Sequence, residues 1–118
     1  MTIRECYDKM RGNYEDVLRR LANDILIKRF LTKFIDDQCY DGLCRAFEAG
    51  DGETAFREAH TLKGVGMNLG LAVLAESASE LTELLRDGVI TDQARTQFKR
   101  VGEDYENTIQ CIRELTDQ

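Results

Sequence analysis

Apolar residues recur every three or four positions over most of this chain, which is the spacing of one face of an α-helix. No alternating pattern typical of strands competes with this repeat, so the chain is predicted to be all-α. The clearest break between helical segments is Gly50-Asp51-Gly52. In the helix that follows it, small residues carry most of the repeat. The members of that stripe are Ala55, Ala59, Leu62, Gly66 and Leu69.

The segment from Asp24 to about Ala49 is predicted to be one long helix, although Gly42 weakens its continuity. Its apolar stripe consists of Ile27, Phe30, Leu31, Phe34, Ile35, Leu43, Ala46 and Phe47. The helix after the break ends near Gly70. Together these two segments form the first half of a helical bundle.

Two more helices follow, and their spacing is that of a bundle seam. The first has Gly88 at its C′ position, and the second begins at Thr91-Asp92. The first seam consists of Leu71, Leu74, Ala78, Leu81 and Leu85. The second consists of Phe98, Val101, Tyr105, Ile109, Ile112 and Leu115. Short connections favour antiparallel neighbours, so residues 23–118 are predicted to form an up-down four-helix bundle.

Residues 1–22 are predicted to add one or two short helices before the bundle. Thr2 and Glu5 have capping-box spacing, and that helix would stop near Gly12. Asn13 can cap a second helix, and Asn23-Asp24 can begin the next. The pattern leaves two roles open for this extension, which either covers the open end of the bundle or serves as a docking arm.

Composition and charge narrow the classes of function. The 118 residues include no proline, which permits long uninterrupted helices. The net charge of −6 offers no basic stripe for a nucleic-acid backbone, so nucleic-acid binding is not expected. No apolar run is long enough to cross a membrane, and the N-terminus lacks the apolar core of a signal peptide. We therefore expect a cytoplasmic protein.

Neither the cysteines nor the acidic residues have the spacing of a metal site. The four cysteines form no Cys-x-x-Cys pair, so we expect reduced, partly buried thiols. Asp36, Asp37 and Asp41 lack the alternating ligands and distal glutamate of a calcium loop, and we expect them on a solvated helix face. No metal and no cofactor of the chain's own is predicted.

The single histidine, His60, lies well off the buried stripe of its helix at about 100° per residue. Gly64 follows one turn later, although each glycine inside a helix costs about 1 kcal/mol relative to alanine. Such a cost indicates that a neighbouring helix or a partner must approach closely. The helical projection places five further residues on the same outer side as the imidazole. They are Phe56, Lys63, Gly64, Met67 and Leu71.

The stretch His60-Thr61-Leu62-Lys63-Gly64, followed by Asn68-Leu69-Gly70, resembles the signature of histidine-containing phosphotransfer (HPt) domains. The resemblance covers roughly residues 24–116, with Val65 and Met67 where smaller residues are common. It implies a four-helix bundle that relays a phosphoryl group between receiver-domain aspartates in two-component signalling. The implied partners are the receiver domains of a hybrid sensor histidine kinase and of a downstream regulator, and we expect the chain to act as a monomer.

The chemistry suits these residues. At pH 7 an imidazole offers a neutral nitrogen that can attack an acyl phosphate and form a phosphohistidine. Lys63 can stabilise charge on the phosphoryl oxygens, and Gly64 gives access to the partner. Phe56, Met67 and Leu71 would supply apolar docking contacts. No glycine-rich nucleotide loop is present, so the chain is predicted to carry phosphoryl groups without kinase activity, and the resemblance implies that the metal comes with the receiver.

Two alternatives remain open from the sequence. The chain could be an adaptor bundle of HPt shape that binds a partner without transferring phosphate. It could also be the phosphorylatable segment of a larger kinase, which the similar motif of chemotaxis kinases allows. Met1 favours a free-standing module over such a segment.

Overall fold

The computed structural model describes residues 1–117, and within them every regular element is an α-helix. The prediction of an all-α chain is confirmed. The helices are α1 (Ile3–Met10), α2 (Tyr14–Leu21), α3 (Asp24–Ile35), α4 (Cys39–Ala49), α5 (Gly52–Asn68), α6 (Ala72–Leu84) and α7 (Asp92–Thr116).

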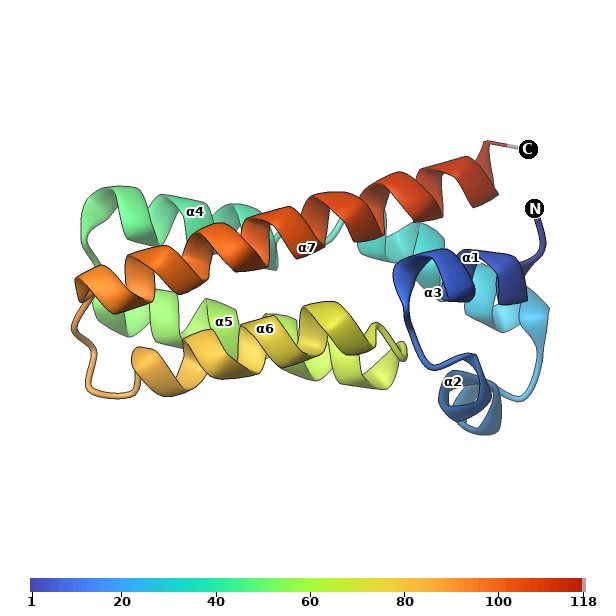
Figure 1. Cartoon of the computed structure of the whole chain (residues 1–118), viewed down its shortest axis with the longest axis horizontal. Helices are drawn as coiled ribbons and strands as arrows, with labels where there is room; N and C mark the ends of the chain where they lie inside the picture. The colour runs from blue at the N-terminus through green and yellow to red at the C-terminus, as the bar shows by residue number, and fades with distance from the viewer. Residues whose placement is uncertain (118) are drawn as a thin grey trace.

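The four helices α4 to α7 lie along the long axis of a molecule that measures 41 × 25 × 19 Å (Figure 1). Helix α5 packs against both α4 and α6, and α6 packs in turn against α7. The 25-residue α7 is long enough to contact α3 and α1 as well. The apolar faces of all these helices meet in one core.

Side-chain caps start the helices at Thr2, Asn13, Asn23 and Thr91, as the sequence predicts. Thr2 and Glu5 form a reciprocal capping box at α1, in which each side chain accepts a backbone N–H. At the starts of α2, α3 and α7, the side chains of Asn13, Asn23 and Thr91 each accept one backbone N–H. These caps satisfy donors that the first turn of a helix leaves unpaired.

The prediction of a single helix from 24 to 49 is wrong, because the chain breaks at Asp36–Gln38. The side chain of Asp37 accepts the backbone N–H of Cys39 at 2.8 Å, a local bond that competes with helix continuation. Gly42, which the sequence marks as the weak point, lies inside α4. A Cβ there would lie 2.8 Å from the carboxylate of Glu58, so this glycine allows α5 to approach.

Aromatic rings join α7 to the two helices on either side of this break. Tyr40 of α4 stacks on Tyr105 with a centroid distance of 4.0 Å, and Phe47 stacks on Phe98 at 4.1 Å. Phe34 of α3 meets Tyr105 edge-on at 5.9 Å. Because such pairs contribute about 0.5–1.5 kcal/mol beyond their buried area, they hold α3 and α4 on one side of α7 despite the break.

Helix α5 approaches α6 closely at one end and the connection after α6 at the other. Near the turn that joins α5 to α6, a Cβ on Gly66 would lie 3.2 Å from the Cβ of Ala75. At the far end, a Cβ on Gly52 would overlap the carbonyl oxygen of Gly88. Gly88 was predicted at the C′ position of α6, but that helix ends at Leu84 with Leu85 as its cap, so Gly88 belongs to the following connection.

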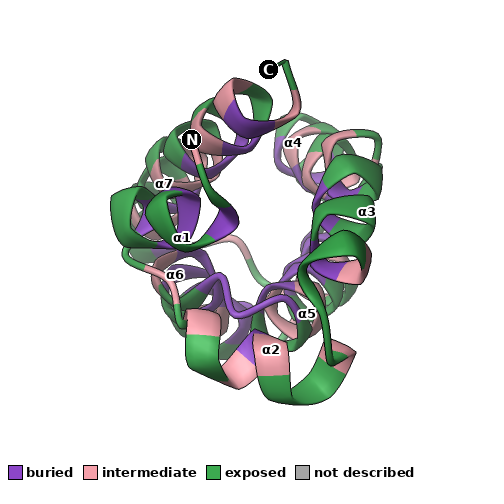
Figure 2. Ribbon diagram, turned by 90° about the vertical axis from the view of Figure 1, so that its right-hand side faces the viewer, coloured by how far each residue is buried: buried purple, intermediate pink, exposed green. Residues whose placement is uncertain are grey.

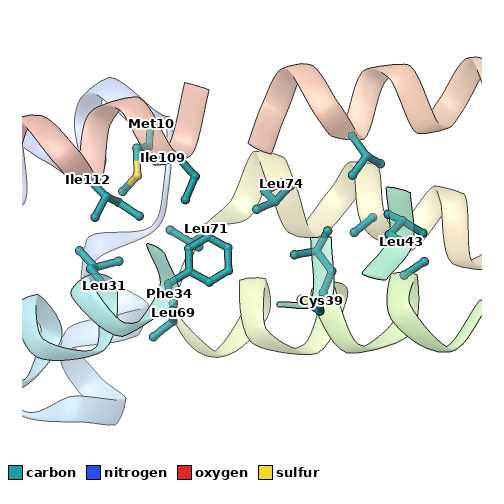
Figure 3. Packing of buried hydrophobic residues seen from close by; sticks show 14 of the residues in the cluster. Met10, Leu31, Phe34, Cys39, Leu43, Leu69, Leu71, Leu74, Ile109 and Ile112 are labelled. Atoms are coloured by element: carbon teal, nitrogen blue, oxygen red, sulfur yellow. The ribbon is translucent and has the colours of Figure 1, made fainter. Parts of the chain in front are cut away.

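The N-terminal helices cover one end of the bundle (Figures 1 and 2). The buried hydroxyl of Tyr7 donates to the carbonyl of Leu69 at 2.6 Å, and the backbone N–H of Asn13 donates to the carbonyl of Gly70 at 2.8 Å. Figure 3 shows Met10 of α1 beside residues of α7 in the same core as Leu71. Of the two roles that the sequence leaves open, the structure supports the covering of the open end.

A matched pair of substitutions tests the close approach of α5 to the connection that contains Gly88. Gly52→Ala is expected to lower the free energy of unfolding by about 1–3 kcal/mol, because the added methyl group overlaps backbone. Gly64→Ala, which adds the same group in open space inside α5, is expected to raise it by about 0.5–1 kcal/mol. Urea unfolding followed by circular dichroism measures both, and equal shifts would contradict the proposed contact.

Candidate functional site

The imidazole of His60 is exposed on the outer side of α5, near the middle of the helix. The inner side is the stripe that the sequence predicts, and all five of its members are buried. Their small side chains bring the α5 backbone close to its neighbours, and the polar side faces solvent. The prediction that His60 lies off the buried stripe is confirmed.

The surface beside His60 is open at Gly64 and closed at Gly66. A Cβ on Gly64 would meet no atom within 4 Å, so nothing covers the backbone one turn after the histidine. Gly66 faces Ala75 of α6 and serves the packing of the two helices. Gly64 therefore leaves the backbone open to solvent, and Gly66 allows close packing of α5 on α6.

Lys63 is half-buried and lies one turn after His60 on α5. Its charge reaches Glu83 of α6. The pKa of Glu83 is lowered chiefly by hydrogen bonding from Arg86, and the positive charges of Arg86 and Lys63 lower it further. Lys63 thus places a positive charge on the side of α5 that faces Glu83, one turn after the histidine.

Two side chains near this face, Glu83 and Arg86, were missed by the sequence analysis. The ring of Phe56 lies 6.2 Å from the imidazole of His60 and nearly parallel to it, and the guanidinium of Arg86 lies 5.6 Å from the centre of the Phe56 ring. Glu83 pairs with Arg86 at 2.6 Å. The short turn at residues 69–71 and the packing of α6 on α5 could have placed these residues opposite Phe56.

The predicted docking residues are only partly on the surface. Met67 is 52% exposed and Phe56 is half-buried, so both can contact a partner. The placement of Leu71 on this face is wrong, since it is 2% exposed and lies in the core (Figure 3). Helix α5 ends at Asn68 and Gly70 turns the chain with a φ of +67°, so the helical projection does not extend to Leu71.

An apolar pocket of about 400 Å³ opens beyond Met67, between α2, α3 and the end of α5. Phe30 is 39% exposed at its rim, although the sequence reading assigned it to the core stripe. Arg20 of α2 donates to the carbonyls of Met67 and Asn68, which belong to the last turn of α5. The pocket is lined by Arg20, Leu21, Phe30, Lys33, Phe34, Asp37, Val65, Asn68 and Leu69.

The cysteines lie away from this face and all four are free thiols. Cys6 and Cys39 are buried, and burial is the main cause that raises the pKa of both, to about 11 for Cys6. Such thiols stay protonated at neutral pH and are poor nucleophiles. Among residues 1–117, no cluster of histidine, cysteine or acidic side chains has an arrangement that could bind a metal ion.

None of the helices in the described part of the chain combines the length and the apolar character needed to span a lipid bilayer. The prediction of a cytoplasmic location stays a prediction.

Comparison with known proteins agrees with the geometry. No curated protein and no solved structure matches the chain. The family model of the Hpt domain matches residues 29–116, which include the whole of α4 to α7 and His60 with its neighbours. Hpt domains carry phosphoryl groups in two-component phosphorelays and interact with receiver domains of response regulators. The chain therefore belongs to the Hpt domain family.

Proposed function

We propose that His60 accepts a phosphoryl group from the phospho-aspartate of one receiver domain and passes it to the aspartate of another. The observation that supports this most is the exposed imidazole beside the uncovered backbone of Gly64, in a chain that belongs to the Hpt family. A partner's active site can reach the ring there without displacing any side chain of α5.

The transfer needs only one bond exchange. A neutral ring nitrogen of His60, the outer Nε2 on steric grounds, attacks the phosphorus of the acyl phosphate, and an N–P bond forms as the bond to the aspartyl oxygen breaks. The carboxylate leaves with the electron pair, and the imidazole releases its other proton to solvent. The reverse exchange delivers the group to the second receiver, which also supplies the divalent metal for the step.

The neighbours of His60 have supporting roles in this proposal. Lys63 stabilises the negative charge of the phosphoryl group, which adds about two charges at neutral pH. Phe56 and Met67 give apolar contact, and the pocket beyond Met67 extends that contact toward α2 and α3. Such a patch with a polar rim is typical of a small, transient interface.

We also infer that α4 to α7 form the antiparallel bundle of the phosphotransfer module, with residues 23–118 as the module and residues 1–22 as an extension. Support comes from the packing of α4 on α5, α5 on α6 and α6 on α7, and from the course of the chain in Figure 1. The match of residues 29–116 agrees with a module that begins in α3. We expect the chain to be a monomer that binds the receiver domains of a hybrid kinase and of a regulator.

His60→Gln tests the acceptor. This variant keeps a polar side chain at an exposed position, so the fold is expected to remain, while phosphoryl transfer from a labelled receiver is expected to fall to background. Gel autoradiography after incubation with the phosphorylated receiver measures the transfer. Label that persists on the variant would exclude His60 as the acceptor, and unchanged receiver binding with no transfer by the natural chain would support the adaptor alternative.

Gly64→Gln tests the access that the uncovered backbone provides. The longer side chain would stand in the path of the receiver, and we expect an approximately tenfold or greater loss in the second-order rate of transfer, which corresponds to about 1.4 kcal/mol. Gly64→Ala is the control, because its single methyl group meets no atom within 4 Å. Transfer by Gly64→Gln at the natural rate would argue against this role for the glycine.

A further inference from the structure

Glu83 of α6 and Arg86 of the turn that follows it form a two-point ion pair next to Phe56. The guanidinium of Arg86 donates twice to the carboxylate of Glu83, through Nη2 at 2.6 Å and through Nε at 3.1 Å. A two-point pair of this kind fixes the plane of the guanidinium better than a single contact does. Arg86 is therefore held in a defined orientation although it lies on the surface.

The fixed guanidinium lies over an aromatic ring of α5. Its central carbon is 5.6 Å from the centre of the Phe56 ring, within the range of a cation–π interaction. The ring of Phe56 is in turn nearly parallel to the imidazole of His60, with an interplanar angle of 10° and a centroid distance of 6.2 Å. Contacts thus run from Glu83 through Arg86 and Phe56 to the histidine.

Glu83 is also close to the charge of Lys63, which follows His60 on α5. The positive charge of Lys63 lies close enough to lower the pKa of Glu83, although the hydrogen bond from Arg86 has the larger effect. Phe56 precedes His60 by one turn and Lys63 follows it by one turn. Arg86 thus pairs with Glu83 and contacts the residue one turn before His60, and the charge of Lys63, one turn after it, also acts on Glu83.

We propose that Glu83 and Arg86 are positioning residues that restrict the rotamer of His60 and aim its outer nitrogen at the incoming phosphoryl group. This rests on the proposed function, because it assigns to α6 the orientation of the accepting ring. An exposed histidine inside a helix would otherwise divide its population between the two χ1 wells that a helix allows. When the ring of Phe56 is held in place, one χ1 rotamer of His60 is favoured. The outer nitrogen of the imidazole is then closer to an attack geometry.

A role confined to stability does not account for this arrangement. The side chains of Arg86 and Glu83 are 59% and 58% exposed, and exposed ion pairs add little to folding free energy. The pair lies over Phe56, which neighbours the acceptor, and the two side chains make no other hydrogen bond among the described residues. What the pair can change is the freedom of Phe56, and through it that of His60.

The first test measures the side chain itself. Three-bond couplings and ring-to-ring nuclear Overhauser effects in labelled protein report the χ1 populations of His60 and its distance from Phe56. In Glu83→Ala and Arg86→Met we expect the dominant His60 rotamer to lose population and the cross-peaks to Phe56 to fall by about half or more. Glu76→Ala is the control, since Glu76 is exposed on α6 and lines a pocket toward α7.

The second test measures reactivity without a protein partner. With phosphoramidate, a small donor, the imidazole forms an N–P bond while the P–N bond of the donor breaks and ammonia leaves with the released proton. The rate constant for this labelling of His60 is expected to fall by about twofold in Glu83→Ala and in Arg86→Met, as one favoured rotamer becomes two. Phe56→Leu, which removes the ring, should show the same fall, and Glu76→Ala should keep the natural rate.

The outcomes separate this proposal from the phosphorelay function. Unchanged rotamer populations and rates in both variants would overturn the positioning role, as would an equal loss in Glu76→Ala. If the rotamer and phosphoramidate results are as expected but no receiver transfers to His60, the positioning role stands and the relay function fails. Circular dichroism of each variant verifies that the helices remain.

Discussion

The close approach of α5 to α6 is the constraint on which the rest of the site depends. Small residues on the inner side of α5 allow it, with Gly66 against Ala75 of α6 at one end and Gly52 against Gly88, in the connection after α6, at the other. A helix packed this tightly has only one way to face, because a rotation about its axis would bring Cβ atoms into backbone. The same packing that buries Ala55 and Ala59 therefore turns His60 outward and brings α6 beside it.

The C-terminal end of α5 is held by residues distant in sequence. At its C-terminal end, Tyr7 and Asn13 donate to carbonyls of the turn, and Arg20 donates to carbonyls of the last helical turn. A cation at a helix C-terminus also interacts favourably with the helix dipole. The short N-terminal helices thus complete the core and add α2 to the wall of the pocket beyond Met67, so that the extension borders the proposed docking face.

The sequence predicts most of the fold because helix periodicity and caps are local signals. The stripe of α5, the caps at Thr2, Asn13 and Thr91, and the outward position of His60 needed no tertiary information. The break at Asp36–Gln38 was missed, since the apolar spacing continues through it and only the bond from Asp37 to the backbone interrupts the helix. Leu71 was misplaced because the helical projection continued α5 through this residue, whereas the helix ends at Asn68. The contact of Arg86 with Phe56 joins the turn after α6 to α5, and it cannot be predicted without knowing how the two segments lie relative to each other.

The central claim is that this chain carries a phosphoryl group on a histidine nitrogen, and the most direct measurement is the chemistry of the linkage. The chain would be incubated with a phosphorylated receiver domain and its intact mass measured before and after treatment with acid and with alkali. The account predicts a gain of one phosphoryl group that acid removes and alkali leaves in place, as expected for a phosphoramidate bond to the imidazole of His60. No gain from a receiver that binds the chain, or a gain that acid does not remove, would contradict it.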